Sequence, residues 1–190
     1  MKVVVAYGSV RSERRGIRAA RWVIGRLEER GHEVTFFDAL ELDLPLLDRM
    51  YKEYDEGEAP HPLPRMASAI RDADAFVIVT GEYNHSLPPG LSNLLDYFLE
   101  EWFWRPSAIV CYSAGSFGGV RAAVHLRSVL AELGMPAIPS ELVVPKIRDA
   151  FDDAGEATDA RLPRRAARFL DELEWYARAM ARERADGVPY

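Results

Sequence analysis

Three nearly uninterrupted apolar runs, each followed at once by a polar loop that contains glycine, constrain the fold of this chain more than any other feature. The runs cover Val3–Tyr7, Ala75–Thr80 and Ala108–Tyr112. Apolar runs without polar alternation are typical of strands buried on both faces of a parallel sheet. Because the carboxyl ends of parallel strands meet at one edge of the sheet, we expect the three loops to lie together there.

Segments with helical periodicity separate these runs. Ile17, Ala20, Ile24 and Leu27 recur at helical spacing, and Gly31 is placed to end that helix. We expect further helices over Pro64–Asp72, from Pro88 and Pro89 onward, over Gly118–Leu133 and over Arg161–Arg184. Two further strands are expected over Glu33–Phe37 and Leu142–Val144. This alternation predicts an α/β fold, namely a doubly wound five-stranded parallel sheet with helices on both faces, in a single domain over residues 1–190.

Composition narrows the class of protein. The chain has 190 residues, of which 48% are hydrophobic and 28% charged, as in one ordinary globular domain. Its net charge of −6 argues against general binding to nucleic acid or to an anionic membrane. The single cysteine, Cys111, excludes an internal disulfide and a cysteine-cluster metal site. No apolar run approaches the roughly 20 residues that span a bilayer, and the chain begins with a strand rather than a signal pattern, so we expect a cytoplasmic protein.

The first loop, Gly8–Gly16, is rich in serine and arginine and enters a helix. It contains no glycine from Ser9 to Arg15, so the dinucleotide-binding motif is missing, although Asp38 follows the second strand where that motif would need an acid. Hydroxyls, the first free N–H groups of the helix and a forked contact from Arg11 or Arg14 suit a single phosphate monoester. The alternative is an ordinary turn before an arginine-rich, solvated helix start.

The second loop, Gly81–Ser86, carries groups that suit a flat polar ring. Asn84 offers both a donor and an acceptor, Tyr83 offers an aromatic face, and Glu82 can contribute through its backbone. His85 is a candidate acid or base, but a histidine that orients or packs is the simpler interpretation. Glu82, taken alone, also fits a solvated loop acid.

The third loop, Ser113–Gly119, allows a close approach of its backbone to a ligand. Gly115, Gly118 and Gly119 supply this freedom, and Ser113 and Ser116 can form hydrogen bonds. The alternative is a flexible turn with Ser116 as the N-cap of the next helix. Each loop has such an ordinary interpretation, but all three lying on one sheet edge favours one composite site.

Together the three loops resemble the NADPH-dependent FMN reductase family, which includes flavin, quinone, azo-dye and chromate reductases of flavodoxin-like fold. The resemblance spans nearly the whole chain, and the segment Glu82–Ser86 is its most specific part. It implies a non-covalently held FMN. For the phosphate, the resemblance implies Ser9, Arg11, Arg14, Gly16 and Ile17. For the isoalloxazine ring it implies Glu82, Tyr83, Asn84 and His85, and from the third loop it implies that Ser113 and Gly115 approach the ring.

Two positions depart from the family pattern. Gly81 stands where members often have proline, which would loosen the ring-binding turn without abolishing binding. Arg15 stands where a small polar residue is frequent, which leaves open which arginine holds the phosphate.

The resemblance implies that the cofactor, and no protein nucleophile, carries the chemistry. We expect NADPH or NADH to give hydride to FMN, and a small acceptor (a quinone, free flavin, azo compound or metal oxyanion) to be reduced next in a ping-pong scheme. Two alternatives stay open. One is a flavodoxin-like electron carrier, and the other is a non-catalytic flavin-binding regulatory protein, because fold alone does not fix function.

Two segments lie outside these loops. The stretch 91–104 holds more apolar and aromatic residues than one helix face needs, with Leu91, Leu94, Leu95, Phe98 and Trp102 as a helical stripe. It predicts a homodimer or homotetramer, with burial against the final helix through Trp175 and Tyr176 as the alternative. The long, proline-rich connection 40–64 follows the second strand and is a candidate gate.

Overall fold

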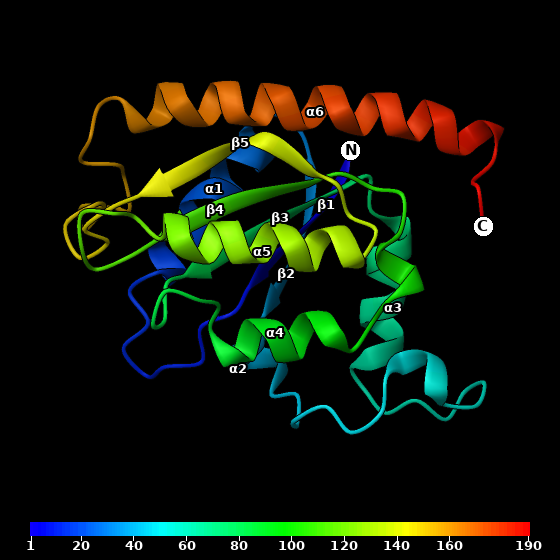
Figure 1. The fold of residues 1–190 in the computed structure, drawn as a ribbon. Helices are drawn as coiled ribbons and strands as arrows, with labels where there is room; N and C mark the ends of the chain where they lie inside the picture. Colours follow the sequence, from blue (N-terminus) through cyan, green and yellow to red (C-terminus); the bar gives the residue numbers. More distant parts are fainter.

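The computed structural model describes all residues 1–190 and shows one five-stranded sheet with helices on both faces (Figure 1). The sheet order is β2-β1-β3-β4-β5, and every neighbouring pair is parallel. The strands are β1 (Lys2–Tyr7), β2 (Glu33–Asp38), β3 (Ala75–Gly81), β4 (Ser107–Tyr112) and β5 (Ala137–Val144). The longer helices are α1 (Ile17–Glu29), α3 (Leu63–Asp72), α4 (Pro89–Asp96), α5 (Val120–Glu132) and α6 (Leu162–Asp186). The predicted doubly wound parallel sheet is therefore confirmed.

The register brings the carboxyl ends of the strands level with one another. Tyr7 at the end of β1 pairs with Asp38 of β2 and with Val79 of β3. Tyr112 at the end of β4 pairs with Gly81 of β3 and with Val144 of β5. Because the strand ends are aligned, the loops that follow them emerge at the same edge, as expected.

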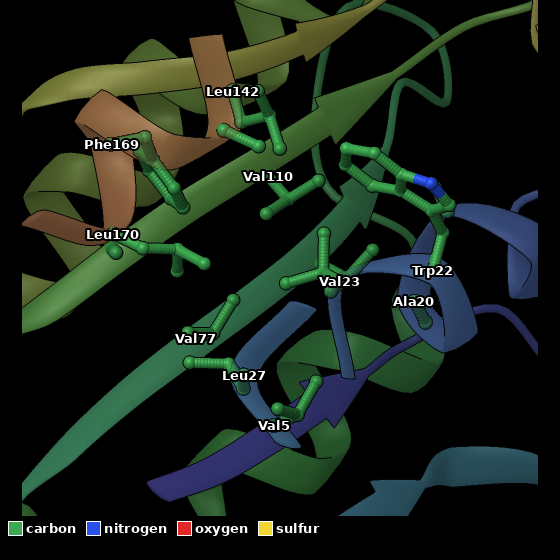
Figure 2. Close-up of a cluster of buried hydrophobic side chains, with 14 of the residues drawn as sticks. Val5, Ala20, Trp22, Val23, Leu27, Val77, Val110, Leu142, Phe169 and Leu170 are labelled. Carbon is green, nitrogen blue, oxygen red and sulfur yellow. The ribbon is translucent and has the colours of Figure 1, made fainter. Parts of the chain in front are cut away.

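Each face of the sheet packs its own hydrophobic core, since successive side chains of a strand point to opposite faces. On one face, Val5, Val77 and Val110 pack against α1 and α6. Figure 2 shows these valines beside Val23 and Leu27 of α1 and Phe169 and Leu170 of α6. On the other face, the alternate residues of the same strands pack against α3, α4 and α5. Burial on both faces explains why these strands are continuously apolar.

The helix that follows Pro88 is shorter than its apolar stripe predicts. α4 ends at Asp96, and a separate 3₁₀ turn, η2, covers Glu100–Trp102. The Trp102 indole N–H donates to the Leu95 carbonyl at 3.2 Å, and the Leu99 N–H donates to the Glu101 carboxylate at 3.3 Å. A continuing α-helix would pair the Leu99 N–H with the Leu95 carbonyl. Instead the Leu99 N–H bonds a side chain, and the Leu95 carbonyl accepts from the Trp102 indole and from the Phe98 N–H at 3.3 Å, so the helix tightens and ends here.

The stretch 91–104 is largely buried within the chain. Leu91, Leu94, Leu95, Phe98 and Trp102 are each at most 1% exposed and belong to the core shared with α3 and α5. Trp175 is exposed, so burial against the final helix through Trp175 is not what covers this stretch. Intramolecular packing accounts for its apolar surface without a second subunit, and the oligomeric state stays a prediction.

The connection 40–64 starts at the carboxyl end of β2 and is fixed to the body of the protein through its middle. It contains a short helix, α2 (Ala39–Leu42), and a 3₁₀ turn, η1 (Tyr51–Glu53), and it runs beneath α4 toward α3 (Figure 1). Asn93 of α4 donates to the Pro45 carbonyl and accepts from the Leu47 N–H, each at 2.8 Å. These contacts anchor the middle of the connection against α4, while its start lies near the cavity, since the Glu41 carboxylate is 4.0 Å from the Arg14 guanidinium. A role as a gate stays a prediction. No helix of the chain combines the length and the apolar character needed to cross a membrane.

Candidate functional site

The three loops surround one open cavity of about 730 Å³ at the carboxyl edge of the sheet. Residues from all three loops form its wall, together with two residues that follow β5. The wall consists of Ser9, Arg11, Glu13, Arg14, Arg15, Gly16, Gly81, Glu82, Tyr83, Asn84, Tyr112, Ser113, Ala114, Ile147 and Arg148. The expected composite site is therefore a single cavity.

The first loop leaves its backbone donors free. None of the backbone N–H groups from Ser9 to Gly16 donates a hydrogen bond inside the chain. The loop leads into α1, whose N-cap residue, Gly16, provides no side-chain cap. Free N–H groups at the start of a helix, where the helix dipole is positive, form a favourable place for an anion.

Of the arginines in the cavity wall, only Arg14 is committed to a carboxylate inside the fold. Its Nη1 donates to Asp38 at the end of β2, and its guanidinium lies 5.6 Å from the centre of the Tyr7 ring. The side chains of Arg14 and Asp38 are 12% and 2% exposed, so this pair is largely buried. Arg11, Arg15 and Arg148 are exposed and form no ion pair within the chain. They are free to contact a bound anion.

The second loop is a tight turn held in one shape. Tyr83 and Ser86 exchange both backbone hydrogen bonds, at 3.0 and 2.9 Å. Between them Asn84 and His85 have positive φ angles of 50° and 65°, as a type I′ turn requires at its two central residues. Asn84 tolerates this conformation well, and its exposed amide faces the cavity. The amide therefore stands ready to contact a ligand on both its donor and its acceptor side.

Side-chain contacts tie the second loop to its neighbours. The Tyr83 hydroxyl lies 2.9 Å from the Ser9 Oγ in the first loop. The Glu82 carboxylate accepts from the Arg121 Nη1 at 2.8 Å and from the Arg121 backbone N–H at 3.3 Å, at the start of α5. The Ser86 hydroxyl lies 3.2 Å from the His125 Nδ1, one turn further along α5. These contacts fix the loop against both the first loop and the helix that follows the third.

Tyr112, at the end of β4, forms the floor between the first and second loops. A Cβ added at Gly16 would lie 2.0 Å from the Tyr112 ring, and one added at Gly81 would lie 2.9 Å from it. Both glycines therefore make room for this ring, which explains why glycine stands at position 81. The Tyr112 hydroxyl donates to the Tyr7 hydroxyl at 3.3 Å, and burial raises the pKa of both groups. Both hydroxyls consequently stay protonated at neutral pH.

The third loop is anchored through its start. The Ser113 N–H donates to the Val144 carbonyl at 3.4 Å, and the Ser113 carbonyl accepts from the Ile147 N–H at 3.0 Å. The Ser113 hydroxyl donates to the Gly115 carbonyl at 3.1 Å, so in this structure it closes the loop on itself. A Cβ added at Gly115 would meet nothing within 4 Å. Gly115 is exposed on its Cα side, and its carbonyl accepts from the Lys146 N–H at 3.0 Å, which ties the loop to the segment after β5.

The cavity brings together most of the residues that the sequence pointed to. Ser9, Arg11, Arg14, Gly16, Glu82, Tyr83, Asn84 and Ser113 line it, whereas Ile17, His85 and Gly115 do not. Cys111 is fully buried, and burial raises the pKa of its thiol to about 12, as fits a packed thiol.

The wall residues that the sequence did not point to are Glu13, Tyr112, Ala114, Ile147 and Arg148. The segment after β5 could have been found, because it emerges at the same sheet edge as the other loops. No signal in the sequence marks Tyr112, which reads as the last residue of a buried strand.

Comparisons with known proteins agree with this architecture. The model of the NADPH-dependent FMN reductase family matches residues 1–149. A quinone reductase from Pseudomonas putida is 34% identical over 179 residues, which cover 90% of this chain and 91% of the relative. The flavoenzyme NAD(P)H:(acceptor) oxidoreductase FerB from Paracoccus denitrificans has a TM-score of 0.72 at 24% identity, covering 92% of this chain and 98% of FerB. A flavodoxin from Pseudomonas aeruginosa has a TM-score of 0.53 at 21% identity, covering 90% of this chain and 99% of the flavodoxin. The chain therefore belongs to the NADPH-dependent FMN reductase family, and its fold is flavodoxin-like.

Proposed function

We propose that this member of the family holds FMN in the cavity at the carboxyl edge of the sheet and uses it to pass electrons from NADPH or NADH to a small acceptor such as a quinone. The observation that carries the proposal is the row of free backbone N–H groups from Ser9 to Gly16 at the start of α1. These N–H groups have no acceptor inside the fold, so they are available to the oxygens of a phosphate monoester at the start of the helix.

The other residues of the first loop complete the proposed phosphate subsite. The Ser9 hydroxyl adds a neutral donor, and Arg11 adds a guanidinium without a carboxylate partner. Arg14 contributes by position, because its ion pair with Asp38 holds the loop against β2. Gly16, the N-cap of α1, contributes its free backbone N–H, whereas the Ile17 N–H donates to the Arg14 carbonyl at 3.3 Å and Ile17 contributes by its position in the first turn. A forked contact from Arg11 to a phosphate is stronger than a hydrogen bond between neutral groups.

The second and third loops provide the proposed ring subsite. Asn84 contacts the polar edge of the ring, and the aromatic face of Tyr83 and the backbone of Glu82 line its side. Ser113 and Gly115 approach from the third loop. His85 lies outside the cavity wall and serves to complete the turn.

Bound FMN would supply the two-electron chemistry that no side chain here provides. The protein would hold the cofactor in place and keeps the second loop in one conformation, and the cavity opens to solvent, which gives a second flat molecule a route to a bound cofactor. One open cavity serves donor and acceptor in turn, which supports a ping-pong order. NADPH and NADH would enter at the same face, and quinones, free flavin, azo compounds and metal oxyanions are the acceptor classes.

The test begins with purified protein incubated with FMN, desalted and examined for visible flavin absorbance. We expect bound flavin, bleaching by NADPH in the absence of oxygen, and recovery of the colour when a quinone is added. Bound flavin that neither NADPH nor NADH bleaches would favour an electron carrier. Protein without retained flavin would contradict the proposal and favour a non-catalytic binding protein.

A homodimer or homotetramer is a separate proposal. The burial of the stretch 91–104 within one chain removes that stretch as its support, so an interface would use other surfaces. Sedimentation at micromolar protein concentration measures the state directly, and a monomer would contradict the proposal.

A further inference from the structure

The cavity wall contains a carboxylate that the proposed chemistry does not need. Glu82 lines the cavity in the second loop, and its side chain is only 8% exposed. A largely buried carboxylate is unfavourable unless a positive partner and hydrogen-bond donors compensate its charge. Its presence beside a site for electron transfer therefore raises the question of what neutralises it.

A single residue, Arg121, compensates this charge. The Arg121 Nη1 lies 2.8 Å from one Glu82 oxygen, and the Arg121 backbone N–H lies 3.3 Å from the other. That N–H belongs to the first turn of α5, where the helix dipole also favours a negative group. Glu82 makes no other ion pair, and Arg121 itself lies outside the cavity wall.

The Arg121 side chain is also held in place. Its guanidinium lies 4.4 Å from the centre of the Phe117 ring in the third loop, in the geometry of a cation–π contact. Arg121 thus joins the loop after β3 to the loop after β4 through one ion pair and one aromatic contact. Of this ion pair, only Glu82 belongs to the cavity wall.

We propose that Arg121 is a positioning residue that sets the reduction potential of bound FMN by neutralising Glu82 in the cavity wall. The inference rests on the proposed function, because it requires FMN in this cavity. Two-electron reduction places negative charge on the flavin ring at neutral pH. An unpaired carboxylate in the wall would repel that charge directly, because like charges fixed close to one another raise the free energy of the charged form. The paired carboxylate does not.

The experiment measures the affinity of the flavin-free protein for oxidised FMN and the reduction potential of FMN in the holoprotein, which together give the affinity for reduced FMN. The dissociation constant for oxidised FMN comes from fluorescence, and the midpoint potential of bound FMN comes from equilibration with redox dyes. For Arg121→Gln we expect binding of reduced FMN to weaken at least tenfold more than binding of oxidised FMN. A tenfold change equals about 30 mV toward lower potential for a two-electron couple. Arg121→Lys keeps the charge and should restore most of the wild-type potential.

The partner variant should act in the opposite direction. Glu82→Gln removes the carboxylate and leaves the Arg121 charge, so reduced FMN should bind relatively more tightly. This shift should be the smaller one, because Arg121 is 39% exposed and water screens its charge. The double variant E82Q/R121Q removes both charges and should return the ratio of the two affinities to within about threefold of wild type.

Arg127→Gln is the matched control. Arg127 lies on the same helix and pairs with Glu141 at 2.9 Å, outside the cavity wall. The Arg127→Gln substitution removes one positive charge from α5, as Arg121→Gln does, and we expect the reduction potential of bound FMN to stay unchanged.

Two results would overturn the inference while leaving FMN binding intact. One is that the Arg121→Gln variant still binds oxidised FMN and shows the wild-type reduction potential. The other is a shift of the same sign in both single variants, which indicates a general structural effect. If Arg121→Gln retains no flavin, Glu82→Gln and the double variant decide, and a lowered potential in Glu82→Gln overturns the inference. Wild-type protein that binds no FMN would overturn the proposed function and this inference with it.

Discussion

The first and second loops build the same cavity in opposite ways. The first loop (Gly8–Gly16) makes no backbone hydrogen bond through its N–H groups from Ser9 onward, and it exposes charged side chains. The second loop (Gly81–Ser86) closes on itself and is tied by its side chains to Ser9, Arg121 and His125. The N–H donors of the first loop are free for a ligand, whereas Tyr83 and Ser86 of the second loop use their N–H donors to close the turn. We infer that the first loop supplies binding strength and the second supplies geometry.

The largest effect is expected from breaking the Arg14–Asp38 ion pair, which holds the first loop against β2. Arg14→Gln should leave Asp38, which is 2% exposed, as an uncompensated buried carboxylate. Losing one partner of a buried pair costs about 3–5 kcal/mol of unfolding free energy. Urea unfolding should show this loss, together with weaker FMN binding. The double variant R14Q/D38N should recover much of the stability, and a single variant as stable as wild type would contradict the buried-pair interpretation.

The steric fit beneath the two loops provides the next test. In Gly16→Ala the added methyl would lie 2.0 Å from the Tyr112 ring, so the ring or α1 must move. Overpacking of this kind costs about 1–3 kcal/mol, and the shift should also impair FMN binding. Gly25→Ala, on the same helix with nothing within 4 Å, is the control and should stabilise the protein by about 0.4–1 kcal/mol. Equal melting temperatures for the two variants would refute the role of Tyr112 as a floor.

A third test separates binding strength from geometry within the ligand. Arg11→Gln should weaken FMN binding about tenfold, because it removes a charge-assisted contact to phosphate. Riboflavin, which lacks the phosphate, should bind equally to the variant and to wild type. Arg21→Gln, an exposed residue of α1 outside the cavity wall, controls for the change in net charge. Equal losses for FMN and riboflavin would place Arg11 away from the phosphate.

The smallest expected effect concerns the tip of the second loop. Asn84→Ala should weaken binding of both FMN and riboflavin by about 1 kcal/mol, since it removes the amide that faces the cavity. His85→Ala should weaken binding less, because His85 does not line the cavity. Titration of both flavins into the two variants gives the ranking, and equal losses would show that the turn itself, rather than the Asn84 side chain, is what matters.

The sequence predicted the parts of this molecule that depend on local pattern. Continuous apolar runs marked β1, β3 and β4, and parallel topology then placed three loops at one edge. The sequence does not predict features that depend on a contact with a residue far away in the chain. Whether Arg11 or Arg14 is free depends on Asp38, which lies on a different strand. The end of α4 depends on the Trp102 indole taking the Leu95 carbonyl. No local pattern of helix-forming residues contains such information.

The cavity floor shows the same limit. Tyr112 belongs to an apolar run and carries no motif, yet its ring occupies the space that Gly16 and Gly81 leave open. The departure at Gly81 was visible in the sequence, but its partner was not. A glycine that stands where a bulkier residue is usual indicates a close approach without saying which residue approaches.

The buried pair of Tyr7 and Tyr112 also makes the folding stability of the protein depend on alkaline pH. Burial raises the pKa of both hydroxyls, while an unfolded tyrosine ionises near pH 10. The stability that these groups contribute is therefore fully present below about pH 10 and is lost as the pH rises further. In an alkaline titration, the exposed tyrosines should give their near-ultraviolet signal first. Tyr97 is also buried and burial also raises its pKa, so the delayed signal of all three buried tyrosines should appear together with unfolding. The absorbance trace therefore reports when the packing around these rings, including the floor of the cavity, is lost.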